Sequence, residues 1–199
     1  MRIGLDRILC DDSGLLGPGR RMELWFHGCQ RNCPGCITKE HNHQPEPMLS
    51  LSVQAVYDAI QNEPEIEGIT ISGGEPFLQS EALLQLAALV HKRGLGIILY
   101  SGYLYEELCS SPQFREILSY LDVLIDGPYL WERDDGRAYR GSSNQRLHHL
   151  TDRYQSFYQK DRVRECRIEQ QGSYLTLTGI PDAASREIWK HLKQGGNIK

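Results

Sequence analysis

The residues best suited to chemistry are three cysteines within eight positions, Cys29, Cys33 and Cys36. Three residues separate the first pair and two the second, and Pro34 and Gly35 bend the backbone so that the sulfurs can converge. Clustered thiolates suit an iron–sulfur cluster, for which cysteine is the usual ligand. Three ligands to a [4Fe–4S] cubane leave one iron without a protein ligand, and an open metal position is where chemistry can occur.

A structural zinc site is the alternative interpretation of the same cysteines. Zinc sites with three cysteines and one histidine exist, and His27, His41 or His43 would supply the fourth ligand. The sequence would then describe a non-catalytic zinc-binding module. The other cysteines, Cys10, Cys109 and Cys166, stand alone and are interpreted as small buried hydrophobic residues, so no second cluster is expected.

A second motif, Gly73-Gly74-Glu75-Pro76, follows a short apolar segment, and the two motifs in this order resemble radical S-adenosylmethionine (SAM) enzymes. Within that superfamily the chain resembles the small activating enzymes of glycyl radical enzymes, and among these the activators of anaerobic ribonucleotide reductase. The resemblance covers roughly residues 14–146, about two-thirds of the chain. It is carried by four further segments: Gly17–Arg20, Tyr100–Tyr103, Asp122–Gly127 and Arg140–Gln145.

The resemblance implies two cofactors, a [4Fe–4S] cluster held by the three motif cysteines and SAM chelated to the fourth iron. Reduction of the cluster would cleave SAM to methionine and a 5′-deoxyadenosyl radical, which abstracts a hydrogen atom from the substrate. Because the cofactors carry this chemistry, we nominate no general acid or base. The segment from Gly73 to Pro76 would hold the SAM amino group through backbone carbonyls and the Glu75 side chain. An ordinary strand–helix turn is the alternative for that segment.

Further site residues are expected where strands end. Ser101 and Asp126 follow apolar segments and would hydrogen-bond to the SAM ribose or carboxylate, with turn-capping as the equal alternative. The polar segment Arg140–Gln145 would line the substrate opening, or else be an exposed loop. Three aromatic residues are expected to pack rather than to bind: Tyr129, Trp131 and Tyr139.

The resemblance implies that the substrate is a glycine in a partner glycyl radical enzyme, with anaerobic ribonucleotide reductase as the candidate partner and flavodoxin or ferredoxin as the electron donor. Two departures from the wider family matter. Gly35 stands before the third cysteine, where many radical SAM enzymes carry an aromatic residue, and roughly fifty residues follow the matched segment. This extension has no counterpart in the resemblance, so a radical SAM enzyme that modifies a small molecule or a ribosomally made peptide stays open.

Composition narrows the class of protein. The 199 residues are expected to form one domain, with a core at about 14–146 and a C-terminal extension at about 147–199. A net charge of −4 gives no reason to expect nucleic acid as a partner. The first residues lack the apolar core of a signal peptide, and no apolar run approaches membrane-spanning length, so we expect a cytoplasmic protein without a membrane partner.

The pattern of apolar residues predicts an α/β fold. Strands are expected at 22–26, 68–71, 96–100 and 123–125, and helices between them near 53–60 and at 81–92, 105–109 and 112–120. Residues 1–20 are expected to be irregular, and residues 127–163 to be mostly loop and broken helix. A hairpin around 171–172 and a final helix after Asp182 complete the chain. Alternating strands and helices predict a parallel sheet, and the resemblance implies an incomplete TIM barrel with the hairpin and helix appended.

Overall fold

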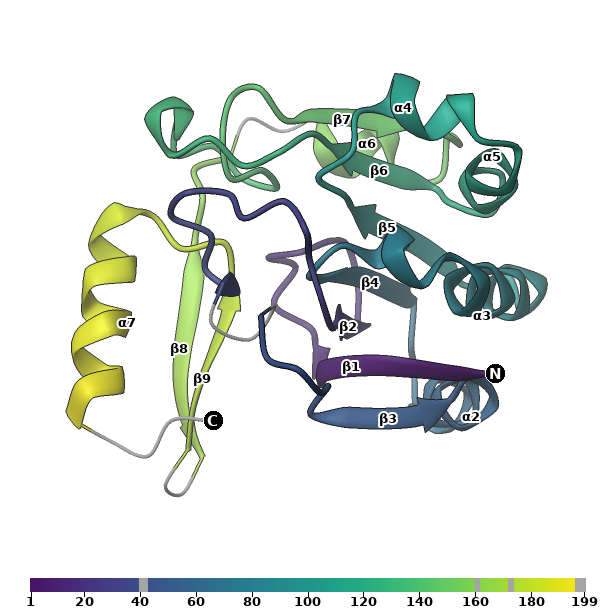
Figure 1. The fold of residues 1–199 in the computed structure, drawn as a ribbon, viewed down its shortest axis with the longest axis horizontal. Coiled ribbons are helices and arrows are strands. Elements are labelled where there is room, and N and C mark those ends of the chain that lie inside the picture. The colour runs from purple at the N-terminus through teal and green to yellow at the C-terminus, as the bar shows by residue number, and fades with distance from the viewer. Residues whose placement is uncertain (40–42, 160–161, 172–173, 196–199) are drawn as a thin grey trace.

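The computed structural model describes residues 1–39, 43–159, 162–171 and 174–195 (Figure 1). Within them the chain forms an α/β fold around one seven-stranded sheet. The order of its strands is β3 (Leu49–Ser52), β1 (Arg2–Asp11), β2 (Arg21–Phe26), β4 (Gly68–Gly73), β5 (Gly96–Tyr100), β6 (Val123–Asp126) and β7 (Arg146–His149). Two further strands, β8 (Cys166–Gln171) and β9 (Tyr174–Gly179), form a separate antiparallel hairpin.

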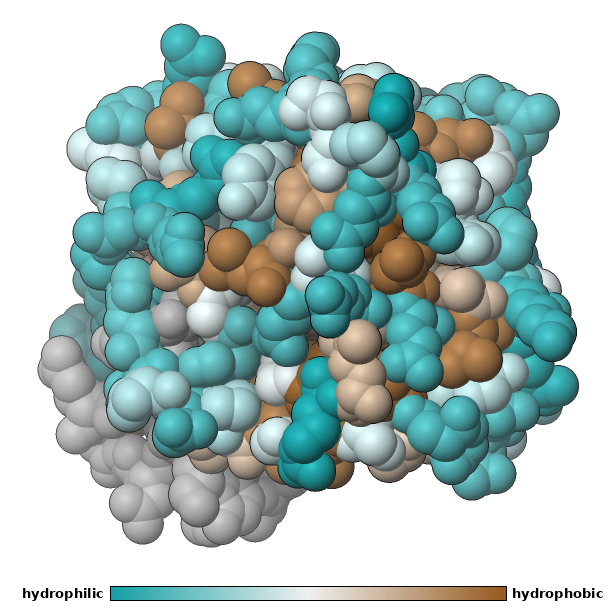
Figure 2. All heavy atoms as spheres, turned by 45° about the vertical axis from the view of Figure 1, so that its right-hand side comes forward, coloured by the Kyte–Doolittle hydropathy of each residue, from teal (hydrophilic) through white to brown (hydrophobic). Residues whose placement is uncertain are grey.

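Four neighbouring strands, β2, β4, β5 and β6, are parallel, as the alternation of strands and helices predicts. Helices link them: α2 (Val53–Asn62), η1 (Pro76–Gln79), α3 (Ser80–Lys92), α4 (Tyr105–Ser110) and α5 (Pro112–Leu118). Figure 1 shows these helices on one side of the sheet, and the β8–β9 hairpin with α7 (Ala183–Gly195) on the other. Two short elements, η2 (Trp131–Arg133) and α6 (Gln155–Tyr158), lie in the connection before the hairpin. Figure 2 turns the helical side forward and shows a mainly hydrophilic surface with apolar patches between.

Alternation along the strands gives the sheet two different faces. On the helical face Leu24, Ile71 and Leu99 belong to one large core of fully buried apolar side chains. The opposite face carries polar groups, among them the buried Arg21, whose guanidinium donates to Thr70 Oγ1 at 2.9 Å and to the Gly96 carbonyl at 3.0 Å. The helical face therefore carries the larger hydrophobic core, and the opposite face combines buried polar groups with a smaller apolar cluster around Ile98, Val123 and Ile125.

The N-terminal segment is a strand, which corrects the expectation of an irregular entry. β1 pairs antiparallel with both β2 and β3, and its register shifts between Leu5 and Arg7. That bulge moves the apolar residues from one phase, Ile3 and Leu5, to another, Ile8 and Cys10, so a simple alternation is not visible in the sequence. A second correction is β7, which pairs antiparallel with β6 inside the segment expected to be mostly loop.

The helix starts are close to those expected. Ser52 caps α2, accepting a hydrogen bond from the Ala55 amide at 3.0 Å, and Asp182 accepts one from the Ser185 amide at 2.7 Å at the start of α7. α3 begins at Ser80, one residue before the start expected from the sequence, and follows the turn η1 directly. Among the described residues, no helix combines the length and apolar character needed to cross a bilayer.

Candidate functional site

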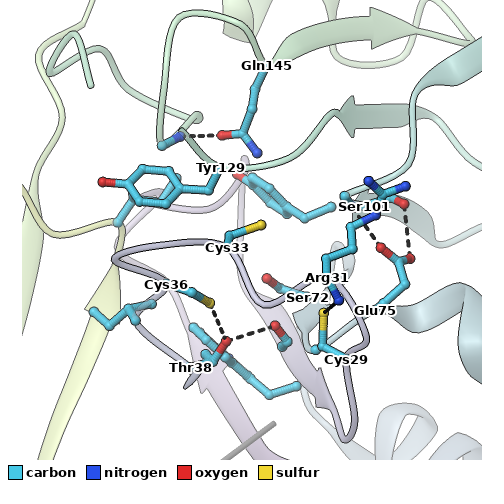
Figure 3. A pocket seen from close by; sticks show the side chains of 18 of the residues that line it. Cys29, Arg31, Cys33, Cys36, Thr38, Ser72, Glu75, Ser101, Tyr129 and Gln145 are labelled. Carbon is cyan, nitrogen blue, oxygen red and sulfur yellow. Dashed lines mark hydrogen bonds between the residues drawn. The ribbon is translucent and has the colours of Figure 1, made fainter. Parts of the chain in front are cut away.

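A cavity of about 170 Å³ opens at the carboxyl ends of the parallel strands, the edge where ligand sites of open α/β sheets gather (Figure 3). The cysteine loop leaves β2, the Gly73–Pro76 segment closes β4, and Ser101 follows β5. Seven residues predicted from the sequence line this cavity together: Cys29, Cys33, Cys36, Gly73, Gly74, Glu75 and Ser101. Pro76 and Asp126 are absent from the lining.

The cysteine loop is shaped by local hydrogen bonds. The Cys36 amide donates to the Cys33 carbonyl at 3.2 Å, which closes a tight turn, and the Arg31 amide donates to Cys29 Sγ at 3.4 Å. Thr38 Oγ1 lies 3.3 Å from Cys36 Sγ and donates to the Gly73 carbonyl at 3.2 Å. Thr38 therefore ties the third cysteine to the end of β4, and this link is not visible in the motif.

The three sulfurs lie at separate places around the cavity (Figure 3). All three thiols are free and partly buried. Burial raises the pKa of the Cys29 thiol above its ordinary value, and the Arg31 amide opposes this shift. In the part of the chain that the structure describes, no three His, Cys, Asp or Glu side chains are grouped closely enough to hold a metal ion. The sulfurs thus surround a space instead of converging on one point, and three thiols around such a space are a donor set that fits an iron–sulfur cluster.

The histidines considered as a fourth ligand are placed differently. Both ring nitrogens of His27 have partners, because Nδ1 lies 2.7 Å from Asp6 Oδ1 and Nε2 lies 3.1 Å from the Gln44 carbonyl oxygen. His43 is exposed and does not line the cavity. His41 lies outside the described residues.

The two glycines at the end of β4 allow two backbone segments to pass very close together. The Gly74 amide donates to the Phe26 carbonyl at 2.7 Å, and the next amide donates to the Gly28 carbonyl at 2.8 Å. A Cβ on Gly74 would lie 2.0 Å from the Gly28 oxygen, and one on Gly73, whose φ is +100°, would lie 2.4 Å from the Phe26 nitrogen. Only glycine fits at these positions, and the close approach fixes the cysteine loop against β4.

Glu75 connects the ends of β4 and β5. Its side chain is 2% exposed, and its carboxylate accepts hydrogen bonds from Ser101 Oγ at 3.0 Å, the Gly102 amide at 2.8 Å and the Phe77 amide at 3.2 Å. Burial raises the pKa of Glu75, and these donors oppose the rise. Ser101 Oγ also accepts from the Tyr103 amide at 3.0 Å, so Ser101 both caps its turn and lines the cavity.

Asp126 is the last residue of β6. It is fully buried, and its carboxylate accepts from the Tyr105 amide and from Arg146, whose guanidinium also forms an ion pair with Glu106. Burial pushes the pKa of Asp126 upward, but these donors hold it below its ordinary value. Pro76 is buried at the start of η1. Neither residue lines the cavity, and the hydrogen bonds of Asp126 go to the start of α4 and to β7.

Several residues that line the cavity were not predicted from the sequence. One is Arg31, whose guanidinium carbon lies 4.4 Å from the centroid of the Tyr103 ring. From the segment expected to line the opening, Gly141 and Gln145 do so, and the Gln145 side chain spans the Gly141 amide and the Gly127 carbonyl. The C-terminal extension contributes the least expected part of the lining, namely Gly179, Ile180, Pro181 and Arg186.

Comparisons with known proteins agree with this geometry. A family described as a 4Fe-4S single cluster domain matches residues 15–148. Proteins named anaerobic ribonucleoside-triphosphate reductase-activating protein are similar to the chain: that of Escherichia coli K12 is 31% identical over 67% of this chain and 91% of the relative. The Vibrio cholerae O1 protein is 33% identical over 68% and 91%, and the Haemophilus influenzae protein 34% identical over 66% and 89%. Among solved structures, QueE from Escherichia coli aligns with a TM-score of 0.44 and 19% identity over 51% of this chain and 53% of that chain, a likeness too weak to add to the assignment.

Proposed function

Because the chain belongs to the 4Fe-4S single cluster domain family and to the anaerobic ribonucleoside-triphosphate reductase-activating proteins, we propose that it is a radical SAM activase that generates the glycyl radical of an anaerobic ribonucleotide reductase. One observation carries the proposal: three free thiols and the Gly73–Glu75 backbone line one cavity at the ends of parallel strands. The reaction is inferred from the family, and the site of the reaction is inferred from the geometry of the cavity.

Each group of site residues has a proposed role. Cys29, Cys33 and Cys36 ligate three irons of a [4Fe–4S] cluster as thiolates. The segment from Gly73 to Pro76 offers backbone groups to the SAM amino end, and the glycines keep that backbone bare of side chains. Ser101 lines the same wall. When bound, the cluster and SAM supply the one-electron chemistry that removes a hydrogen atom from the partner's glycine.

The remaining lining controls shape and water. Trp25, Ile37 and Tyr129 make much of the cavity wall apolar, which limits water around a reactive intermediate. Glu75 accepts two hydrogen bonds from the loop after β5, from Ser101 and the Gly102 amide, and one from the Phe77 amide, so its carboxylate orients the wall while remaining almost fully buried. The chain's own residues thus bind, orient and exclude water, and no side chain is needed to move a proton.

We further propose that flavodoxin or ferredoxin supplies the electron. The cysteine loop lies at the surface, with Asn32, Pro34 and Gly35 exposed beside the partly buried sulfurs. A small redox protein can approach a cluster held in such a loop. The same exposure allows the partner's glycine segment to approach, as an activase with a macromolecular substrate requires.

The finer description of the fold is also a proposal. The parallel strands β2, β4, β5 and β6, with their helices on one face and the site at their carboxyl ends, support an incomplete TIM barrel. We propose one radical SAM domain over 1–199. The strand β7, at 146–149, spans the start of the expected extension and joins it to the sheet.

The test uses anaerobically reconstituted protein, SAM, a chemical reductant and a purified anaerobic ribonucleotide reductase. We expect release of 5′-deoxyadenosine and a doublet glycyl signal in the electron paramagnetic resonance spectrum of the reductase. Cys33→Ala should abolish both, whereas Cys109→Ala, which alters a cysteine outside the cavity, should retain both. Cluster-loaded protein that cleaves SAM but forms no glycyl radical on any cognate reductase would refute the assigned substrate.

A further inference from the structure

The C-terminal extension reaches back to the cysteine loop. The β8–β9 hairpin ends at Gly179, and the turn through Pro181 leads into α7, which lies beside the loop and shares a groove with it. Residues from the turn and from α7 complete the wall of the cavity that the cysteines line. This part of the chain lies beyond the residues matched by the family, which end at 148.

Arg186 makes the direct contact between α7 and the cysteine motif. Its Nη1 donates to the Gly35 carbonyl at 3.0 Å, across 151 positions of sequence. Its guanidinium carbon lies 4.7 Å from the centroid of the Tyr129 ring, and its Nε donates to the Pro181 carbonyl at 3.1 Å. The side chain is 18% exposed, so these partners hold a largely buried guanidinium in one orientation.

A hydrogen bond to the backbone of Gly35 acts directly on the position of the third cysteine. It is the residue before Cys36, and it has a φ of +73° inside the turn that the Cys33 carbonyl and Cys36 amide close. A Cβ on it would face Trp131 at 3.4 Å, Tyr129 at 3.5 Å and Arg186 at 3.7 Å. A hydrogen bond to its carbonyl therefore fixes the peptide that carries the third sulfur.

An ion pair with Asp134 does not account for the position of Arg186. The nearest approach between Arg186 Nη2 and Asp134 Oδ2 is 3.7 Å, and that carboxylate is already paired with the more deeply buried Arg164. The shorter contact of Arg186 is the one with the Gly35 carbonyl. A guanidinium directed at a backbone carbonyl beside a metal-binding cysteine is the arrangement expected of a residue that orients a ligand.

We propose that Arg186 is a positioning residue for the cluster: it locks the Cys33–Cys36 turn and places a permanent positive charge beside it. This inference rests on the proposed function only in that the three thiolates hold the cluster. Two consequences follow. Loss of the hydrogen bond loosens the third ligand, and loss of the charge makes reduction of an anionic cluster less favourable, because nearby charge and hydrogen bonds set cluster potentials.

Two substitutions separate the consequences. Arg186→Gln removes the charge, whereas Arg186→Lys keeps the charge but cannot reproduce the planar contact with Gly35 and Tyr129 together. Arg167→Gln is the matched control, because Arg167 lies on β8 of the same extension, is about half exposed, and pairs with the exposed Glu169 at 3.5 Å. Each reconstituted protein is examined for the rate of iron transfer to a chelator and for cluster potential in a redox titration followed by electron paramagnetic resonance.

Both Arg186 variants should release iron faster than wild type, by about tenfold for Gln, the size expected for one hydrogen bond to a charged group. Arg186→Gln should shift the reduction potential of the cluster clearly to more negative values. Arg186→Lys, which keeps the positive charge, should have a potential close to that of the wild type. Arg167→Gln should match wild type in both measurements. Release rates and potentials of Arg186→Gln equal to those of Arg167→Gln would overturn the inference.

One control tests whether each variant is folded, and another separates failure of this inference from failure of the proposed function. Circular dichroism melting of each apo-protein sets a temperature at which all are folded, and iron release is compared there; if Gln does not fold, the release rate of Lys decides. Neither measurement involves the reductase. A wild-type protein that binds no iron and sulfide refutes the proposed function, whereas intact cluster binding that is insensitive to residue 186 refutes this inference alone.

Discussion

Replacing Gly74 by alanine should be among the most damaging single-methyl additions in the protein. The new Cβ would lie 2.0 Å from the Gly28 carbonyl oxygen and 2.7 Å from its carbon. Those atoms are backbone and cannot rotate away. The two segments would have to separate by about 1 Å, against amide hydrogen bonds of 2.7 and 2.8 Å from Gly74 and Glu75.

The magnitude follows from two contributions. Overpacking a well-packed site costs about 1–3 kcal/mol, and weakening two buried backbone hydrogen bonds adds about 1 kcal/mol each. We therefore expect Gly74→Ala to lower the free energy of unfolding by about 3–5 kcal/mol. The φ of Gly74 is not in the left-handed region, so no backbone strain enters this sum.

Urea denaturation of the reduced apo-protein measures this loss. With a slope of about 2–3 kcal/mol per molar urea, the midpoint should fall by about 1–2.5 M. Gly94→Ala is the control, because Gly94 has a φ of +79° but open space where a Cβ would lie, so only about 1–2 kcal/mol of strain is expected. A Gly74→Ala protein as stable as Gly94→Ala would refute the argument that close backbone contact is why glycine is needed there.

Three further predictions concern buried carboxylates of the fold and the cysteines. Burial raises the pKa of Glu23 from 4.5 to about 7, so the folded state holds a proton that the unfolded state loses, and wild-type stability falls as pH rises through that window. Glu23→Gln removes this titration. In urea melts, the unfolding free energy of the variant minus that of the wild type should therefore increase by about 1–3 kcal/mol between pH 5 and pH 8. A difference that does not change with pH would contradict this prediction. Asp126→Asn should cost about 2–3 kcal/mol because it weakens the charge-assisted hydrogen bonds that the buried carboxylate accepts from the Tyr105 amide and Arg146. Glu106→Gln, on the exposed side of the same arginine, should cost under about 1 kcal/mol; equal losses in thermal melts would be inconsistent with this. Iron and sulfide analysis after anaerobic reconstitution should show loss of the cluster on alanine replacement of Cys29, Cys33 or Cys36, and retention on replacement of Cys10, Cys109 or Cys166.

The parallel part of the fold was predictable because its strands obey one simple rule. Buried strands such as 68–71 and 96–100 are short apolar runs followed by glycine or polar turns, and the helices between them keep one apolar face. β1 was missed because its bulge shifts the apolar phase halfway along. β7 was missed because an edge strand of four residues, Arg146–His149, has little apolar character and depends on pairing with β6.

The site shows the same division. Cys29, Gly74 and Ser101 come from three separate segments, and the sequence could place them together because each follows a parallel strand and such strands end at one edge of the sheet. Asp126 follows a strand in the same way, but its carboxylate turns to Arg146, a partner that the sequence does not pair with it. Arg186 carries no local signal, because its role depends on how a hairpin outside the motifs folds back. Such tertiary contacts are where pattern-based inference ends.

The long separation between Gly35 and Arg186 also has a consequence for biosynthesis. At about 5–20 residues per second, the ribosome adds the 151 positions between them in about 8–30 s. Throughout that interval the three cysteines have already been synthesised while the helix that secures their turn does not yet exist. Iron and sulfide delivered to the nascent chain would therefore meet an unrestrained loop, and stable loading is expected to follow completion of the polypeptide.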